Sequence, residues 1–469
     1  MCFSKPEIKT LLSALHEKYV FVPTDKASNN IAIICKVFYI SQSMKELVIF
    51  KNNIAIEQEN STYMLINNDI QKIIDRHVKY VSSKLNCDKI PKQLPFLYWI
   101  PKMHKKPYSK QRYIAASGFC TTKPISKMLT KCFRLIDKQL KLISKHFFHQ
   151  SGINPYWIIL NSTDVFKVVS PFNINNKCEN ILTYDFSTLY TNIPHKKLKQ
   201  EFTWIFNEAF KNSKKTFISV YTHHANWSNN PNIKTPHFTK SQLIKITHWL
   251  IDNIYVTFGD KCFQQKIGIP MGTDCAPYLA NLFLFACEYK WIMKQFKGKK
   301  FHLLAKFKGC CRYIDDLLLI NNDNTMKRVM SHLYPKELIL VPDGTNGTKT
   351  HFLDLSLVIK NNFLSSSIYD KRDVFNFPIV NFPFLKGNIP NRSSYGVFIG
   401  ELVRYARGCT FIKEFKDKSL ITILKLKKQF FTLKMLKRYW FKFCKKHILL
   451  IHKYGSDILD FHKDWVNFF

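Results

Sequence analysis

The sequence predicts an α+β fold, in which antiparallel strands and helices occupy separate parts of the chain. Residues 310–320 (CCRYIDDLLLI) place two adjacent aspartates between apolar, strand-like flanks. Adjacent side chains on one strand point to opposite faces of a sheet, so this pair fits best at the tip of a tight hairpin. Residues 124–147 have the spacing of a basic amphipathic helix, and residues 361–469 are helical, basic and aromatic in character.

The composition favours a protein that binds nucleic acid. The 469 residues include 71 Lys and Arg against 33 Asp and Glu, which gives a net charge of +38. Such a surplus is typical of proteins with a polyanionic partner. Codon bias would enrich Lys, but it does not account for so few acids. The hydrophobic content of 46% is enough for a large core, in a multi-lobed enzyme or in roughly two to four domains.

Cysteine usage and the apolar segments bear on the cellular location. The 13 cysteines are scattered without a Cys-x-x-Cys pair, which favours a reducing compartment over a disulfide framework or a zinc module. No apolar segment approaches the ~20 residues that a membrane span needs, and residues 1–6 lack the apolar core of a signal peptide. We therefore expect an intracellular protein, located in the nucleus and not bound to a membrane.

The first half of the chain contains a basic segment that is interrupted by prolines. Before it, residues 21–30 predict a turn, residues 31–35 a strand and residues 64–85 a helix. Residues 96–116 predict a basic β-hairpin. Lys supplies point charge and Arg can bind phosphate oxygens in a bidentate manner, so this hairpin suits a triphosphate; a solvated basic loop is the alternative. Its basic residues are Lys102, Lys105, Lys106, Lys110 and Arg112.

A third acid follows a second strand-like segment. Residues 181–184 lead into Asp185, and a turn rich in hydroxyl groups comes next. Asp185 at a strand end could bind a metal jointly with Asp315, with the carbonyl of Phe186 as a further ligand. Five residues later, Tyr190 provides an aromatic ring where a sugar 2′-OH would have to pass. The alternatives are an aspartate that caps an ordinary polar turn, a core tyrosine and, for the Asp-Asp pair, a solvated turn.

Two more segments follow in the second half of the chain. Residues 268–277 (GIPMGTDCAP) predict a glycine-containing loop that opens a buried helix, with Thr273 or Asp274 as its cap. Glycines there would let the backbone approach a nucleotide closely. Residues 352–357 predict part of a strand pair, and the basic and aromatic C-terminal helices suit either a groove along a duplex backbone or a charged bundle.

The order of these elements resembles that of a reverse transcriptase. The hairpin at 313–316 has the Tyr-x-Asp-Asp form of the palm of those enzymes, and it follows a basic hairpin, a strand ending in Asp and a glycine loop. The sequences of residues 101–105, 185–194, 268–277 and 352–354 are similar to those of Penelope-like retroelement proteins. The resemblance covers roughly residues 20–469.

The resemblance implies a right-hand polymerase with an antiparallel palm sheet and a helical C-terminal thumb. Its activity would be RNA-directed DNA synthesis, extending a primer 3′-OH with dNTPs, and its origin a retroelement. An RNA-directed RNA polymerase is disfavoured by Tyr190, and an inactive or domesticated nucleic-acid-binding remnant by the three intact acids. The implied regions are an N-terminal mixed region (1–90), a fingers-like region (91–180), a palm (181–360) with an insertion near 210–240, and a thumb-like region (361–469).

The resemblance also implies roles for individual residues and partners. Two Mg²⁺ ions, with Mn²⁺ as an alternative, would bind to Asp185, Phe186, Asp315 and Asp316. RNA template, DNA primer and dNTPs would be the substrates, and a separate endonuclease a partner, because the sequence contains no GIY-YIG domain. Met271 stands where many retroviral enzymes have Gln. The expected nucleotide-binding residues are Lys105, Lys110, Arg112, Tyr190, Met271 and Gly272, and the expected nucleic-acid-binding residues are Tyr313, Phe352, Lys427, Lys428, Lys437 and Arg438.

Overall fold

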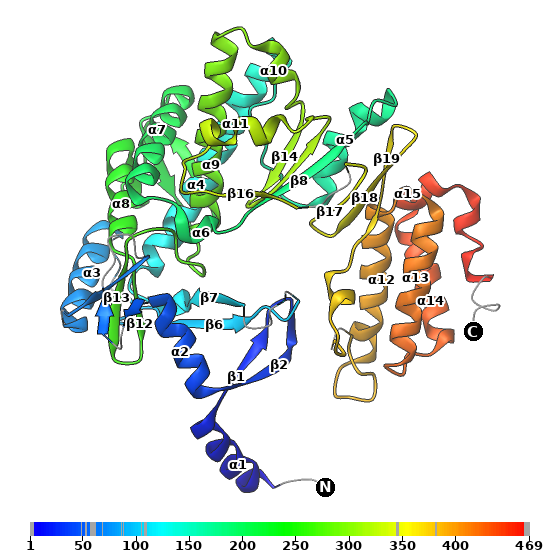
Figure 1. The fold of residues 1–469 in the computed structure, drawn as a ribbon, viewed down its shortest axis with the longest axis horizontal. Coiled ribbons are helices and arrows are strands. Elements are labelled where there is room, and N and C mark those ends of the chain that lie inside the picture. Colours follow the sequence, from blue (N-terminus) through cyan, green and yellow to red (C-terminus); the bar gives the residue numbers. More distant parts are fainter. Residues whose placement is uncertain are drawn as a thin grey trace. The chain divides into compact units, whose positions relative to one another are not determined.

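Contacts within the chain divide it into two units, each assembled from segments that are far apart in the sequence (Figure 1). The structure is a computed structural model that describes residues 4–463 except 48, 52–53, 57–61, 68, 86, 88, 105, 107–109, 344–346 and 380–381. Unit 1 comprises Met1–Ile158, Phe186–Ala305 and Met326–Val341, and unit 2 comprises Ile159–Asp185, Lys306–Thr325 and Pro342–Phe469.

Unit 1 has a helical core in which α4 and α7 contact each other and both contact α8 and α9. Helix α9 is apolar on nearly all sides, and its residues 282–286 are buried, as the sequence pattern predicted. Helix α4 begins at Lys123 and ends at Ser151, and the left-handed conformation of its C-cap Gly152 closes the helix. The helices of this core are α4 (Lys123–Ser151), α7 (His195–Ser213), α8 (Lys240–Asp252) and α9 (Ala276–Lys297).

Unit 1 also contains several small antiparallel sheets. The predicted basic hairpin is confirmed, because β6 (Leu97–Pro101) pairs with β7 (Gln111–Ala115) in antiparallel register. Residues 21–30 are less of a turn than expected: strands β1 (Tyr19–Thr24) and β2 (Ala27–Cys35) take up most of them. The other strands of unit 1 are β3 (Ile49–Lys51), β4 (Ile54–Ile56), β5 (Tyr63–Ile66), β9 (Phe217–Val220), β10 (Ala225–Ser228), β11 (His237–Thr239), β12 (Tyr255–Phe258) and β13 (Lys261–Gln265).

The central sheet has the strand order β14-β15-β8-β16. Strand β15 pairs antiparallel with both β14 and β8, so the expected hairpin is confirmed. Nearly all side chains of β14 and β15 are buried, which explains why this segment is a continuous apolar run rather than an alternating one. Helix α5 (Val165–Ile174) packs against β14. The strands are β8 (Ile181–Phe186), β14 (Gly309–Tyr313), β15 (Asp316–Ile320) and β16 (Leu340–Pro342).

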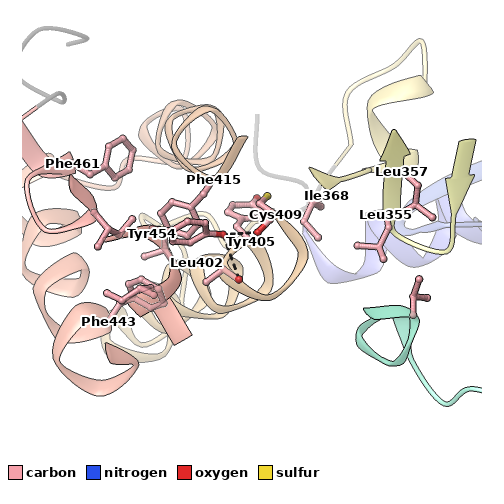
Figure 2. Close-up of a cluster of buried hydrophobic side chains, with 14 of the residues drawn as sticks. Leu355, Leu357, Ile368, Leu402, Tyr405, Cys409, Phe415, Phe443, Tyr454 and Phe461 are labelled. Atoms are coloured by element: carbon pink, nitrogen blue, oxygen red, sulfur yellow. Dashed lines mark hydrogen bonds between the residues drawn. The ribbon is translucent and has the colours of Figure 1, made fainter. Parts of the chain in front are cut away.

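The rest of unit 2 is a three-stranded meander packed on helices. Buried and half-buried residues alternate along β18 and β19, and the buried set joins the core of α12, α13 and α14. Figure 2 shows Leu355 and Ile368 on the strand side of this core and Phe415, Phe443 and Tyr454 on the helical side. The elements are β17 (Lys349–Phe352), β18 (Leu355–Lys360), β19 (Phe363–Ile368), α12 (Asn391–Gly408), α13 (Ile412–Lys427) and α14 (Leu433–Lys446).

Shorter or peripheral elements complete the described chain. The predicted α+β class is confirmed, since helices and antiparallel strands occupy different segments. None of the described helices combines the length and the apolar character that crossing a membrane requires. The remaining helices are α1 (Lys5–Lys18), α2 (Lys36–Leu47), α3 (Ile70–Leu85), α6 (Leu189–Asn192), α10 (Phe301–Ala305), α11 (Thr325–Leu333) and α15 (Ile448–Ile451).

Candidate active site

Three carboxylates meet at one end of the central sheet, all within unit 2. Asp316 is the first residue of β15 and lies directly opposite Asp185 of β8, while Asp315 occupies the hairpin turn between β14 and β15. Directly opposed residues of antiparallel strands have their Cβ atoms only about 5 Å apart. One carboxylate oxygen from each of the three side chains lies within 4.8 Å of the others. Strand pairing thus brings together acids that are 130 residues apart in the chain.

The backbone of this hairpin turn is strained. Only two residues, Ile314 and Asp315, separate the paired residues Tyr313 and Asp316. Ile314 has a φ of +54°, in the left-handed region that a β-branched residue rarely occupies, at a cost of roughly 1–3 kcal/mol. Positive φ at the first of two loop residues is the requirement of a type II′ turn, which normally uses glycine there. The surrounding sheet therefore has to hold Ile314 in this conformation.

A buried arginine supports the turn. Arg312 has an exposed fraction of 0%, and its Nη1 donates a hydrogen bond of 2.9 Å to the carbonyl oxygen of Ile314. Its own carbonyl oxygen accepts a hydrogen bond from the backbone N–H of Ile159. A hydrogen bond from a charged donor contributes about 1.5–3 kcal/mol, which is comparable with the strain of the turn. The sequence singled out the aspartates but not this residue, although an arginine in an apolar strand is itself an unusual feature.

The three acids are a suitable donor set for divalent cations. Mg²⁺ and Mn²⁺ prefer oxygen ligands, and carboxylates so close together repel one another unless cations neutralise them. All three side chains are half-buried, so solvent screens this repulsion only in part. The Phe186 side chain is buried and packs edge-to-face on Tyr334, with ring centroids 4.9 Å apart. Its carbonyl group remains a predicted ligand.

In unit 1, the glycine loop (residues 268–277) forms backbone hydrogen bonds with both strand β7 and helix α6. The carbonyl oxygen of Met271 accepts a hydrogen bond of 2.8 Å from Ala115 N, and the N–H of Ile269 donates one of 2.6 Å to the carbonyl of Tyr190. Gly272 has a φ of +117°, and a Cβ there would lie 2.2 Å from the carbonyl oxygen of Ala115. The glycine is therefore required by close packing of the loop on β7. The structure thus brings Tyr190, Met271 and Gly272 together.

The expected cap of the following helix is wrong. Helix α9 begins at Ala276 with Cys275 as its N-cap, and no side chain caps it. The carboxylate of Asp274 instead forms an ion pair with Lys123, with an N–O distance of 2.8 Å. The N–H of Cys275 donates to the hydroxyl of Ser126 at 3.2 Å. The Ser126 hydroxyl of α4 takes over the capping role, which no local pattern could predict.

Arg112, the predicted triphosphate ligand, has a partner that the sequence did not suggest. Its Nη1 lies 3.3 Å from the Asp25 carboxylate, which is 5% exposed. Asp25 sits in the turn between β1 and β2, and its N–H donates to the carbonyl oxygen of Pro101 in β6. Lys110 is exposed and directly precedes β7, and Lys105 lies outside the described residues. Asp25 orients the guanidinium while leaving it 40% exposed.

The residues predicted to contact nucleic acid occupy different environments in unit 2. Tyr313 is half-buried at the end of β14. Phe352 is 2% exposed and packs in the core, so its role in this structure is packing, because no ring face is open to a base. The remaining four residues are exposed at the end of α13 and on α14: Lys427, Lys428, Lys437 and Arg438.

Comparisons with known proteins identify the fold. No family model and no curated protein matches this chain. Telomerase from Candida albicans, solved with a fragment of telomeric RNA, matches with a TM-score of 0.61 and 12% identity over 99% of this chain and 75% of that one. The chain has the α+β fold of a right-hand polymerase. The predicted fold class is thereby confirmed, whereas an identity of 12% says nothing more specific than fold.

Two other solved structures are more distant. Apo telomerase from Candida tropicalis has a TM-score of 0.49 at 11% identity, covering 98% of this chain and 73% of that one. The RNA-dependent RNA polymerase of BmCPV has a TM-score of 0.39 at 9% identity, covering 88% of this chain and 30% of that one. Neither similarity is close enough to favour one template or one product.

Proposed function

We propose that this protein is an RNA-directed DNA polymerase that extends a primer 3′-OH with dNTPs. The observation that carries the proposal is the cluster of Asp185, Asp315 and Asp316, whose carboxylate oxygens lie within 4.8 Å of one another. The cluster occurs at the strand-paired end of a sheet in a chain with a polymerase fold. An ordinary solvated turn would not bring in a third acid from a distant strand.

The three acids would hold two divalent cations. When bound, two Mg²⁺ ions, or Mn²⁺ in their place, activate the primer 3′-oxygen and stabilise charge on the leaving pyrophosphate. The reaction joins the 3′-oxygen to the α-phosphorus of the dNTP and breaks the bond between the α- and β-phosphates. The role of the protein is to keep the acids in position, which the β8–β15 register and the Arg312-supported turn achieve.

Sugar selection would depend on Tyr190. Its backbone carbonyl is held by Ile269, so the helix turn that carries the ring is anchored to the glycine loop. A ring at this position would collide with a ribose 2′-OH and lie against a deoxyribose. Arg112, held by Asp25, and the neighbouring Lys110 would bind the triphosphate.

The finer assignments rest on the resemblance of the motifs. They comprise a Penelope-like retroelement origin, an RNA template and a DNA primer as substrates, a separate endonuclease as a partner, and action in the nucleus. The surplus of basic residues supports nucleic-acid substrates. The exposed cations of α13 and α14 support a duplex-binding role for the C-terminal region, 361–469. The boundaries of the four predicted regions belong to the same proposal.

Primer extension on an RNA template tests the proposal against its alternatives. We expect incorporation of dNTPs with Mg²⁺ and little incorporation of rNTPs. Tyr190→Val should raise the ratio of rNTP to dNTP incorporation, while Tyr190→Phe, which keeps the ring, should leave it unchanged. An RNA polymerase would prefer rNTPs from the start, and an inactive remnant would bind duplex without extending it. If Tyr190→Val lowered both activities in parallel with its melting temperature, Tyr190 would be a core residue and not a gate.

A further inference from the structure

A groove in unit 1 has six Lys and Arg residues among those that line it. It lies among α7, α9 and α11 and has a volume of about 650 Å³. Glu201 is the one acid among its lining residues, all of which the structure describes. We call it the basic groove, and define it by Lys197, Lys290, Lys294, Lys300, Arg328 and Lys336.

Four of these six cations have no carboxylate partner among the residues that the structure describes. Glu201 pairs with Lys290, whose Nζ also lies 4.8 Å above the ring of Trp204. The other four lysines of the basic groove are exposed and form no ion pair with any carboxylate among the residues that the structure describes. Cations gathered in a hollow raise the local concentration of anions. The natural occupant is therefore an anion that carries several charges.

The cations form a row that continues beyond the basic groove. A second hollow of about 440 Å³ shares Lys290 and Lys294 and adds Lys297, against one lining acid, Glu208. These three lysines stand at i, i+4 and i+7 of α9, on one face and over about 10 Å of helix axis. The half-buried rings of Trp204 and Tyr289, with centroids 5.6 Å apart, line the same hollow. A row of cations beside aromatic rings suits an extended polyanion that has free base faces.

We propose that the basic groove and its continuation bind a single-stranded segment of RNA, separately from the primer–template duplex. A duplex presents phosphates but no free base faces, whereas an unpaired strand offers both, and base stacking on aromatic rings contributes about 1–3 kcal/mol per base. The choice of RNA over DNA rests on the proposed function: during RNA-directed DNA synthesis the product DNA is paired, and the unpaired strand is the RNA. The polyanion site itself does not depend on catalysis.

The test measures RNA binding directly in the full chain. A fluorescent RNA of about 20 nucleotides is titrated with protein already saturated with unlabelled primer–template duplex. The variant carries Lys294→Gln and Lys297→Gln in the last turn of α9 and Lys300→Gln just after this helix. The control carries Lys211→Gln, Lys214→Gln and Lys215→Gln, which remove the same charge from the exposed C-terminal end of α7, outside both hollows.

Salt dependence provides the expected magnitude. Each lost phosphate contact to a single strand lowers the slope of log K against log salt by about 0.7, so three contacts lower it by about 2. Raising salt from 50 to 200 mM should then weaken RNA binding by the wild type about 16 times more than binding by the groove variant. The control should behave like the wild type, and melting curves should show both variants folded.

Several results would overturn the proposal. Equal slopes for groove and control variants would show that general charge, not the groove, binds RNA. Displacement of RNA by free dNTPs would make the groove a nucleotide site, and tighter binding of single-stranded DNA of the same sequence would refute the choice of RNA. In contrast, Trp204→Ala should weaken RNA binding with an unchanged salt slope. Because no step of the test requires extension, an inactive polymerase would refute the proposed function alone.

Discussion

Replacing Asp315 with Asn should stabilise the metal-free protein and abolish its stabilisation by Mg²⁺. The substitution keeps the shape of the side chain and removes two of the three carboxylate repulsions in the cluster. At separations of 4.8 Å each repulsion amounts to about 0.9 kcal/mol in bulk water and about 3.5 kcal/mol at an effective dielectric constant of 20. Because the groups are half-buried and screened, we expect a gain near the lower bound for two pairs, about 2 kcal/mol.

Thermal melting in a chelator and in Mg²⁺ measures both effects. A gain of about 2 kcal/mol corresponds to a melting temperature higher by about 4–8 °C for a domain of this size. Added Mg²⁺ at 100 times its dissociation constant should stabilise the wild type by about 2.7 kcal/mol and the variant much less. The variant should therefore melt at a higher temperature than the wild type in chelator, and at the same or a lower temperature in Mg²⁺. Binding of the duplex by the variant should stay close to that of the wild type.

Asp417→Asn is the matched control, since Asp417 is an exposed acid on α13 outside the cluster. It should change neither the melting temperature in chelator nor the response to Mg²⁺. The reasoning fails if Asp315→Asn is no more stable than the wild type without metal, or if Mg²⁺ stabilises both proteins equally. Wild-type rates of primer extension by Asp315→Asn would refute the metal assignment independently.

Three further predictions concern other parts of the chain. Gly272→Ala should lower the stability of unit 1 by more than about 1 kcal/mol, because φ is +117° and the new Cβ would meet the carbonyl oxygen of Ala115. The control Gly400→Ala, in open space on α12, should be neutral or stabilising, and urea denaturation of both variants measures the difference. Burial lowers the pKa of His77 to about 4, with Arg76 contributing, so the unfolded chain takes up a proton first as the pH falls. Stability should therefore decrease between about pH 6.5 and 4, by about 3 kcal/mol in total, and His77→Gln should flatten this dependence in pH-resolved melting curves. Neutralising Lys437 and Arg438 together should reduce the salt slope of duplex binding by about 2; an unchanged slope would remove α14 from the duplex-binding surface.

The sequence alone determined the elements whose chemistry is local. A pair of aspartates between apolar strands predicts a hairpin, and the structure has one there, with Asp315 in its turn and Asp316 as the first residue of β15. The basic β6–β7 hairpin and the helix α9, which is apolar on nearly all sides, could likewise be predicted from the sequence, because the periodicity of apolar side chains reflects local burial. The same local signal misled at Asp274, which was expected to cap α9 but lies one residue before the N-cap and pairs with Lys123.

Only the tertiary structure decided which distant residues meet. Three contacts depend on how strands and loops pack, and no spacing in the chain encodes them. They are the Asp25–Arg112 ion pair, the hydrogen bond from Arg312 to Ile314 and the close approach of Ala115 to Gly272. The burial of Phe352 and the gathering of lysines from α7, α9 and the segment after α11 have the same origin. The physical reason is that a one-dimensional pattern specifies which face of an element is apolar, whereas register, turn geometry and packing choose the partner on the other side.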